Sequence, residues 1–344
     1  MSAMSVLFSR GICVISASIA LLMGSVIAGM ERKVQARIQQ RIGPPILTPG
    51  FWSWLKFYYK KKVRPLATAP SFYIWTVVLG IFVVLLLLIV TLPPVWGFLG
   101  LASILGVVGF LKLEELLYVL MGSVSQSIMS VPLFPWDIVR GGKVLGTRRE
   151  FFEQQSALRA LKMIGLGSIP LYVAIAVPFA MAKSPYISDV IRLQNPAFFT
   201  ESIFPLPSSP AFFTVYGFFA SIVFFIGYVI LLNDKPFNII KPKIDIMEGG
   251  TLEYGAIYRA YMYIFSQVMA FVLSSVYVTL FLGIPLDVTR PALLALHLVL
   301  TLPLPIFKAV LAAFSPVLTF RQIYSASAGL TAIGAFALIA SLII

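Results

Sequence analysis

The chain has 344 residues, of which 59% are hydrophobic and only 11% are charged. Soluble domains are about 25% charged, and a soluble fold could not keep this much apolar surface away from water. Composition therefore excludes a soluble enzyme and predicts an integral membrane protein, in which the formal charge of +13 must be explained by the placement of basic residues.

Apolar stretches long enough for membrane-spanning helices, about 20 residues each, recur along the chain. With approximate boundaries they cover residues 8–30, 71–93, 95–121, 151–182, 211–232, 255–283, 292–312 and 323–344. Their continuous apolar character excludes a transmembrane β-barrel, and residues 29–32 offer no signal-peptide cleavage site. The predicted fold is an all-α polytopic membrane protein with about eight transmembrane helices, forming a single membrane domain over residues 1–344.

The basic residues alternate between the two sides of the predicted bundle. Loops at about 31–70, 122–150, 233–254 and 313–322 hold nine, four, three and one Lys or Arg residues, whereas the loops on the other side hold three in total. The positive-inside rule places the four basic loops in the cytoplasm and both termini outside.

The loop 31–70 contains aromatic residues directly before a lysine run. Trp52 and Trp54 lie in an aromatic segment, and residues 60–62 are all lysine. Rings favour headgroup depth and lysines reach toward anionic lipid, so a short interfacial helix is expected. This helix is either a lipid anchor or the wall of a lateral opening for a lipophilic ligand.

Three ionisable residues lie inside the third stretch, where each costs about 3 kcal/mol to insert. Lys112 and Glu115 are three positions apart, so they share a helix face and are expected to pair. Glu114 points elsewhere and needs another partner. The group is either a self-neutralised contact between helices or part of a proton path.

Other ionisable residues lie at the ends of stretches. Glu150, Glu153 and Arg159 stand at the start of the fourth stretch, and Arg159 is the deepest of the three. Lys308 is expected near the cytoplasmic end of the seventh stretch. His297 is expected to be a hydrogen-bonded packing residue.

The loop 233–254 mixes Pro, Gly and both charge signs with Phe, Ile and Met. A solvated linker would be poorer in apolar residues, so this loop is expected to pack against another surface, such as a partner protein. It contains Asp245 and Glu253, and Glu253 either caps the following helix or faces a polar cavity.

The chain has one cysteine, Cys13, and one histidine, His297. Iron–sulfur clusters need several thiolates and bis-histidine haem needs two imidazoles, so this chain cannot hold such a redox centre alone.

One motif resembles a known family. Residues 31–44 read Glu31-Arg32-Lys33-Val34-Gln35-Ala36-Arg37-Ile38-Gln39-Gln40-Arg41-Ile42-Gly43-Pro44. This run resembles the E-R-K-x-x-A-x-x-Q-x-R-x-G-P signature of the complex I subunit 1 (NuoH) family, which includes the equivalent subunits of membrane-bound hydrogenases and related ferredoxin-linked complexes. Further matches are Pro236-Phe237-Asn238 through Gly249 with Glu253-Tyr254-Gly255, and Ser156-Ala157-Leu158-Arg159 with Ile169-Pro170-Leu171.

The resemblance implies a membrane subunit, in a prokaryotic cell membrane, that joins a soluble electron-transfer arm to an ion-pumping membrane arm. Implied partners are the lipid bilayer, peripheral iron–sulfur or NiFe-type subunits and antiporter-like membrane subunits, with no nucleic acid. Iron–sulfur clusters are then expected in partner subunits, with no cofactor bound by this chain alone.

Candidate residues follow from the intramembrane charges and the resemblance together. The ion-pathway candidates are Glu31, Glu114, Glu115, Glu150, Glu153, Arg159, Asp245 and Glu253. The docking and orienting candidates are Arg32, Lys33, Arg37 and Arg41.

The chain also departs from complex I sequences. Asn238, Lys241 and Lys243 stand where those sequences tend to have acids, the fourth-span glutamate falls on Ser168, and a sixth-span acidic position falls near Ser266-Gln267. The usual quinone-cavity pattern after Gly43-Pro44 is replaced by residues 48–54. These departures weaken the carry-over of a quinone site and favour a quinone-independent hydrogenase-like or sulfur-reducing complex, or an unusual complex I. Substitute carboxylates are then sought among Glu114, Glu115, Glu150 and Glu153.

Two alternatives belong to other classes. A stand-alone secondary transporter would often show internal repeats, which the two halves of this chain lack. A passive membrane anchor for a peripheral reductase would not need the intramembrane charges.

Overall fold

The computed structural model describes residues 3–65, 67, 69–97, 100–124, 152–200, 205–240 and 249–343. Within these ranges the regular elements are all helical. Six candidate membrane spans are present, and α9 (Val215–Leu231) is a shorter apolar helix. α4 (Ile104–Val124) also has the length of a span but carries three charged residues. The predicted all-α polytopic membrane protein is confirmed.

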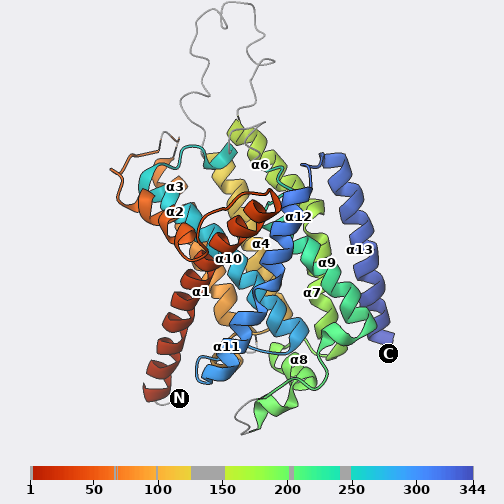
Figure 1. The fold of residues 1–344 in the computed structure, drawn as a ribbon. Coiled ribbons are helices and arrows are strands. Elements are labelled where there is room, and N and C mark those ends of the chain that lie inside the picture. Colours follow the sequence, from red (N-terminus) through yellow and green to blue (C-terminus); the bar gives the residue numbers. More distant parts are fainter. Residues whose placement is uncertain are drawn as a thin grey trace, which may run out of the picture.

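The spanning elements coincide, in order, with the predicted apolar stretches. They are α1 (Ala3–Ile38), α3 (Pro70–Thr91), α4, α6 with α7 (Phe152–Lys162 and Ile169–Met181), α9, α10 (Ala256–Leu282), α11 with α12 (Pro291–Leu300 and Pro303–Phe314) and α13 (Phe320–Ile343). A short helix, α8 (Ile187–Gln194), lies between α7 and α9. Both termini lie at the same end of the bundle, as an even number of spans requires (Figure 1).

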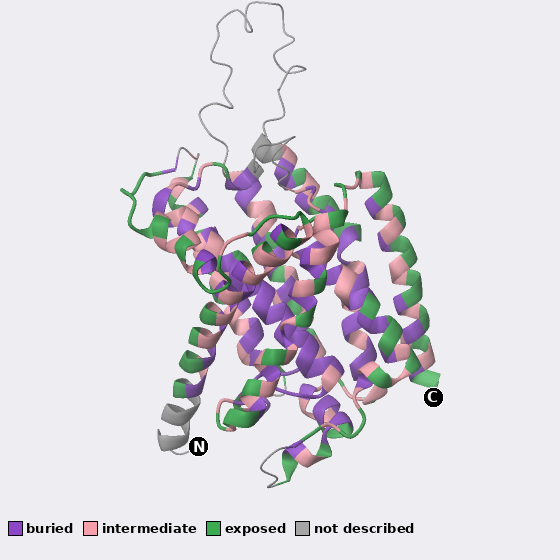
Figure 2. Cartoon of the chain, in the orientation of Figure 1, coloured by how far each residue is buried: buried purple, intermediate pink, exposed green. Residues whose placement is uncertain are grey.

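α10 forms the centre of the bundle (Figure 2). Every side chain from Gln267 to Phe281 is buried, which is the expected state of a helix that is hydrophobic around its whole circumference. The helix ends at Gly283, whose left-handed backbone has φ +68°. A side chain there would also collide with Gln194, whose amide donates to the carbonyl of Leu280 at 2.7 Å.

The first helix is longer than predicted. α1 continues to Ile38 instead of ending near residue 30, so residues 31–38 of the basic motif are helical and not part of a loop. The helix terminates where Gln40 adopts a positive φ of 59° and the amide of Arg41 bonds back to the carbonyl of Ala36 at 2.7 Å. Arg32 and Arg37 therefore lie on the helix, whereas Arg41 lies in the turn after it.

Two predicted stretches are interrupted at prolines. The fourth contains a π-helical turn, Met163–Gly167, before α7. Pro170 has no N–H to donate to the carbonyl of Leu166, and the hydroxyl of Ser327 donates to that carbonyl instead, at 2.5 Å. The seventh stretch breaks between α11 and α12, where Pro303 and Pro305 likewise remove backbone donors. Hydropathy alone does not reveal either break.

The predicted short helix exists as α2 (Thr48–Tyr58). It packs between α1 and α10, because the Gln267 amide donates to the carbonyl of Gly50 at 3.1 Å and the Ser25 hydroxyl bonds to Gln267 at 3.0 Å. Gln267, near the expected acidic position of the sixth span, therefore joins three helices. The depth of α2 in a bilayer stays a prediction.

Gly50→Ala is expected to lower stability by about 1–3 kcal/mol, because the new methyl group would collide with the backbone of Ser25. The measurement is the thermal unfolding midpoint of the purified protein in detergent. Gly109→Ala is the matched control, since a side chain at Gly109 meets nothing within 4 Å. Equal midpoints for the two variants would contradict close packing of α2.

The described parts of the loop 233–254 pack against the chain itself. The Tyr73 and Tyr254 rings stack with centroids 4.0 Å apart, and the Tyr254 hydroxyl donates to the carbonyl of Tyr73 at 2.6 Å. Burial raises the pKa of Tyr254, so its phenol stays neutral. The expectation of a packed loop is confirmed for these parts, and Asp245 lies outside the described residues.

Candidate functional site

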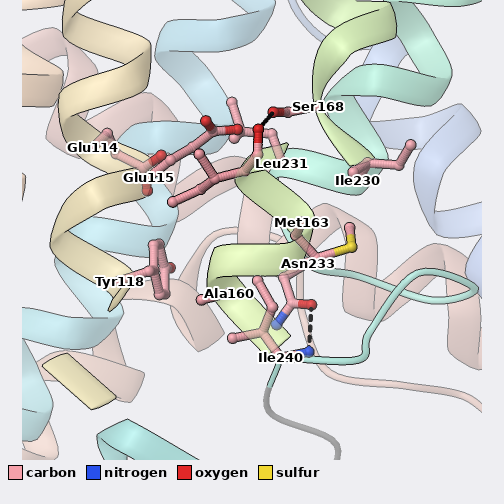
Figure 3. Close-up of a pocket in the computed structure, with 11 residues that line it drawn as sticks. Glu114, Glu115, Tyr118, Ala160, Met163, Ser168, Ile230, Leu231, Asn233 and Ile240 are labelled. Carbon is pink, nitrogen blue, oxygen red and sulfur yellow. Dashed lines mark hydrogen bonds between the residues drawn. The ribbon is translucent and has the colours of Figure 1, made fainter. Parts of the chain in front are cut away.

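A small cavity of about 20 Å³ lies among α4, the π turn and the end of α9 (Figure 3). Its walls combine carboxylates and other polar groups with apolar side chains. The lining residues are Glu114, Glu115, Tyr118, Ala160, Met163, Ile164, Ser168, Ile230, Leu231, Asn233 and Ile240.

Lys112 and Glu115 form the predicted ion pair. The Lys112 Nζ lies 2.8 Å from Oε2 of Glu115 and also donates to the Ser168 hydroxyl at 3.1 Å. It contacts the carbonyl of Ile164 at 3.2 Å and the face of the Tyr172 ring at 4.2 Å. Glu115 is 6% exposed whereas Lys112 is 37% exposed, so the carboxylate is the buried partner.

The π turn places Ile164 and Ser168 where the ammonium group of Lys112 reaches both. The Ser168 hydroxyl also lies 3.5 Å from the carbonyl of Ile164. π-helical turns occur frequently at functional sites. The break in the fourth stretch thus provides hydrogen-bond acceptors for the ammonium group of Lys112 on α4.

Glu114 is buried and borders the cavity together with Glu115 (Figure 3). Adjacent residues of a helix point in different directions, so the cavity extends along more than one face of α4. Asn233 completes one wall, and its Oδ1 accepts from the amide of Ile240 at 3.3 Å.

A second cluster, centred on the buried Lys308, joins three separate segments. The Lys308 Nζ on α12 lies 2.8 Å from Oε1 of Glu31 on α1 and 2.5 Å from Oδ2 of Asp234, which follows α9. Lys308 is buried, so the two carboxylates supply the counter-charge that it needs. Glu31 was among the predicted candidates, whereas Asp234 was not. Lys308 within an apolar stretch indicates that a carboxylate partner is needed, which was the available signal for Asp234.

Arg159, on α6, forms a hydrogen bond with the segment after α9. Its Nη1 donates to the carbonyl of Ile239 at 3.1 Å, and its guanidinium lies 5.7 Å from the centre of the Phe320 ring. Ser156 donates to the carbonyl of Ile240 at 2.9 Å. The structure therefore makes Arg159 a positioning residue for a wall of the cavity.

The remaining ion-pathway candidates are placed only in part. Glu253 lies in the turn before α10, but the N-cap of that helix is Gly255 and has no side-chain cap, so the capping prediction is wrong. Glu150 and the side chain of Glu153 lie outside the described residues.

The docking candidates occupy the end of α1 and the turn after it. Arg32, Arg37 and Arg41 are exposed, as docking requires. Lys33 is half-buried and donates to the carbonyl of Ile42 at 2.8 Å, so it holds the turn after the helix.

His297 is fully buried, with Nδ1 2.8 Å from the carbonyl of Ile284 and Nε2 2.9 Å from the Ser275 hydroxyl. A carbonyl only accepts, so Nδ1 carries the proton, and a neutral ring then accepts from Ser275. These bonds agree with the expected packing residue.

The fold and its buried charges define a multi-pass membrane protein whose helices enclose ionisable residues. The chain belongs to the NADH dehydrogenase family, whose model matches residues 11–131 and 150–343. It is therefore a membrane subunit of the complex I-like oxidoreductases, as its motifs imply.

Individual relatives agree with the family. The chain is 37% identical over 326 residues to an uncharacterised protein of Methanocaldococcus jannaschii, covering 95% of this chain and 96% of the relative. It is 23% identical to an NADH-quinone oxidoreductase subunit of Maricaulis maris, over 66% of this chain and 59% of the relative. The fold is similar to a chain of the membrane-bound sulfane sulfur reductase, an archaeal respiratory membrane complex, with a TM-score of 0.73 at 20% identity, covering 98% of this chain and 99% of that one.

Proposed function

We propose that this chain is the non-redox subunit that couples electron transfer in a peripheral arm to ion movement in the membrane arm of its complex. The observation that carries the proposal is the ion pair between Lys112 and the buried Glu115, with the Lys112 ammonium also bound to Ser168 at the π turn. Ser168 stands where complex I sequences have a fourth-span glutamate. Glu115 supplies a carboxylate at this place from the neighbouring helix.

The contacts of the cavity suggest how coupling works. Asn233 and Ile240 line the cavity, while Asp234, in the same segment, pairs with Lys308. A movement of this segment therefore changes the surroundings of both Glu115 and Lys308. When Lys112 moves away, the buried carboxylate of Glu115 loses its counter-charge and takes up a proton, and the proton leaves when the lysine returns.

The chemistry of electron transfer belongs, in this proposal, to partner subunits. With one cysteine and one histidine in the chain, iron–sulfur clusters are held by peripheral iron–sulfur or NiFe-type subunits. Among the described residues, no group of three or more His, Cys, Asp and Glu side chains could hold a metal ion. The replaced quinone-cavity pattern favours a complex that works without quinone at this subunit.

The arrangement of charges supports an orientation. The end of α1 that carries Arg32 and Arg37 lies opposite the termini, at the same end of the bundle as α2 (Figure 1). We place this end in the cytoplasm, against the peripheral arm, and both termini outside the cell membrane.

Native purification through an affinity tag on this chain tests the proposed position. Iron–sulfur or NiFe-type subunits and antiporter-like membrane subunits are expected to co-purify in fixed proportion, identified by mass spectrometry. A pure chain that moves a solute in liposomes without partners would overturn the proposal in favour of a transporter.

A further inference from the structure

The side-chain amide of Asn233 has a fixed orientation at the wall of the cavity. Asn233 is 2% exposed, and its Oδ1 accepts from the amide of Ile240, as drawn in Figure 3. Because a backbone N–H only donates, the side-chain oxygen must face Ile240 and the NH₂ group must face the other way. The buried Nδ2 has no hydrogen-bond acceptor among the residues that the structure describes. A buried donor of this kind needs an acceptor from another source.

The backbone of Asn233 holds the amide in place. Its φ of 51° lies in the left-handed region, which asparagine adopts more readily than most residues. Its N–H donates to the carbonyl of Ile230 at 3.0 Å, at the end of α9. The direction of the NH₂ group is therefore set by the end of a spanning helix and by the bond to Ile240.

The cavity has the size and the polar walls that one water molecule requires. A volume of about 10–15 Å³ holds one water, and the cavity has about 20 Å³ on the same measure. A buried water also needs about two to four polar partners. Besides Asn233, the polar residues that line the cavity are Glu114, Glu115, Tyr118 and Ser168. The site can therefore satisfy both the oxygen and the protons of a water.

The direction of the amide favours water over a metal cation. The hydrogens of the Asn233 NH₂ group carry partial positive charge, so they repel a cation and donate to the oxygen of a water. The same water can then donate its own protons to carboxylates on the opposite wall.

We propose that the cavity binds one water molecule through Nδ2 of Asn233, and that this water passes protons between Glu114 and Glu115. The proposal rests on the function proposed above and extends the route of the proton beyond Glu115. Protonated Glu114 gives its proton to the water oxygen while the water gives one of its own protons to ionised Glu115. The water is left unchanged, and the proton has moved from one carboxylate to the other. Asn233 is a positioning residue, because it orients the water and exchanges no proton itself.

The same segment links this water to the second cluster. Asn233 directly precedes Asp234, which pairs with Lys308. A movement of the segment therefore displaces the donor that holds the water, so the relay works only in one position of the segment.

Electron cryo-microscopy of the native complex, at a resolution that shows ordered water, tests the binding site. One density peak is expected about 2.7–3.2 Å from Nδ2 of Asn233 and at a similar distance from a carboxylate oxygen of Glu114 or Glu115. A cavity without this peak, or with an occupant out of reach of Nδ2, would overturn the proposal.

Asn233→Asp tests the relay. Aspartate keeps the size of the side chain and an acceptor for the N–H of Ile240, but it turns an oxygen toward the water in place of the donor. Gradient formation by the complex in liposomes is expected to slow about tenfold, the effect of one lost hydrogen bond on a rate. The ratio of the rates in H₂O and D₂O is expected to rise, because proton transfer then limits the reaction.

Asn238→Asp is the matched control, because it adds the same charge to the same segment at a residue that does not line the cavity. Its rate is expected to stay within about twofold of the parent, with an unchanged isotope ratio. A normal rate in Asn233→Asp, or equal losses in the two variants, would overturn the relay. If Glu115→Gln is uncoupled in the same assay, the proposed function stands and only the role of Asn233 fails.

Ala160→Val replaces Asn233→Asp if that variant fails to assemble. Ala160 is buried and lines the cavity, so the added methyl groups occupy the place of the water. Slower gradient formation with a higher isotope ratio is expected here too, and a rate and isotope ratio equal to those of the parent would overturn the relay.

Discussion

Glu115→Gln is expected to lower coupled turnover by about 100-fold, which is the lower range for loss of a positioned proton-transfer group. Coupled turnover here means electron transfer that builds an ion gradient. Glutamine keeps the shape of the side chain and its contact with Lys112 but cannot be ionised or release a proton. The measurement is the rate of gradient formation by the complex reconstituted in liposomes, with subunit composition as the check on assembly.

Asp189→Asn is the matched control for this result. Asp189 is a carboxylate on α8, at the end of the bundle near the termini, where it accepts from the Ser184 hydroxyl at 2.5 Å. Neutralising it is expected to leave coupled turnover within about twofold of the parent, as for surface substitutions with small energetic effects. Normal turnover in Glu115→Gln would remove Glu115 from the ion path.

Lys308→Met is expected to destabilise the protein by about 3 kcal/mol, the lower end for breaking a buried ion pair, because Glu31 is only 16% exposed and loses its cation whereas Asp234, 44% exposed, can turn to water. The expected result is a lower unfolding midpoint in detergent and less assembled complex in the membrane. The triple variant that adds Glu31→Gln and Asp234→Asn removes the uncompensated charges and should recover most of the loss. A stable Lys308→Met protein would show that the cluster does not hold α1, α12 and the segment after α9 together.

Local patterns in the sequence predicted the parts of the fold that depend on neighbouring residues. The apolar stretches matched the spanning elements because each span is set by its own hydropathy. The pairing of Lys112 with Glu115 followed from their spacing on one helix face.

Long-range contacts could not be predicted in the same way. Asp234 and Lys308 are separated by 74 positions, and no periodicity connects them. The π turn depends on Pro170 together with the donor Ser327 on another helix, so hydropathy shows one continuous span. That Glu114 and Glu115 border one cavity could not be predicted either, because its other walls come from α9 and the π turn.

The central claim is that α4 supplies the carboxylate that complex I sequences carry on the fourth span. The most direct measurement is the ratio of ions moved to electrons transferred in liposomes containing the Glu115→Ser, Ser168→Glu double variant. The carboxylate then stands on the other side of the same contact with Lys112, and a ratio near that of the parent is expected, while Glu115→Ser alone gives a ratio near zero. A double variant as uncoupled as Glu115→Ser, in a fully assembled complex, would contradict the claim.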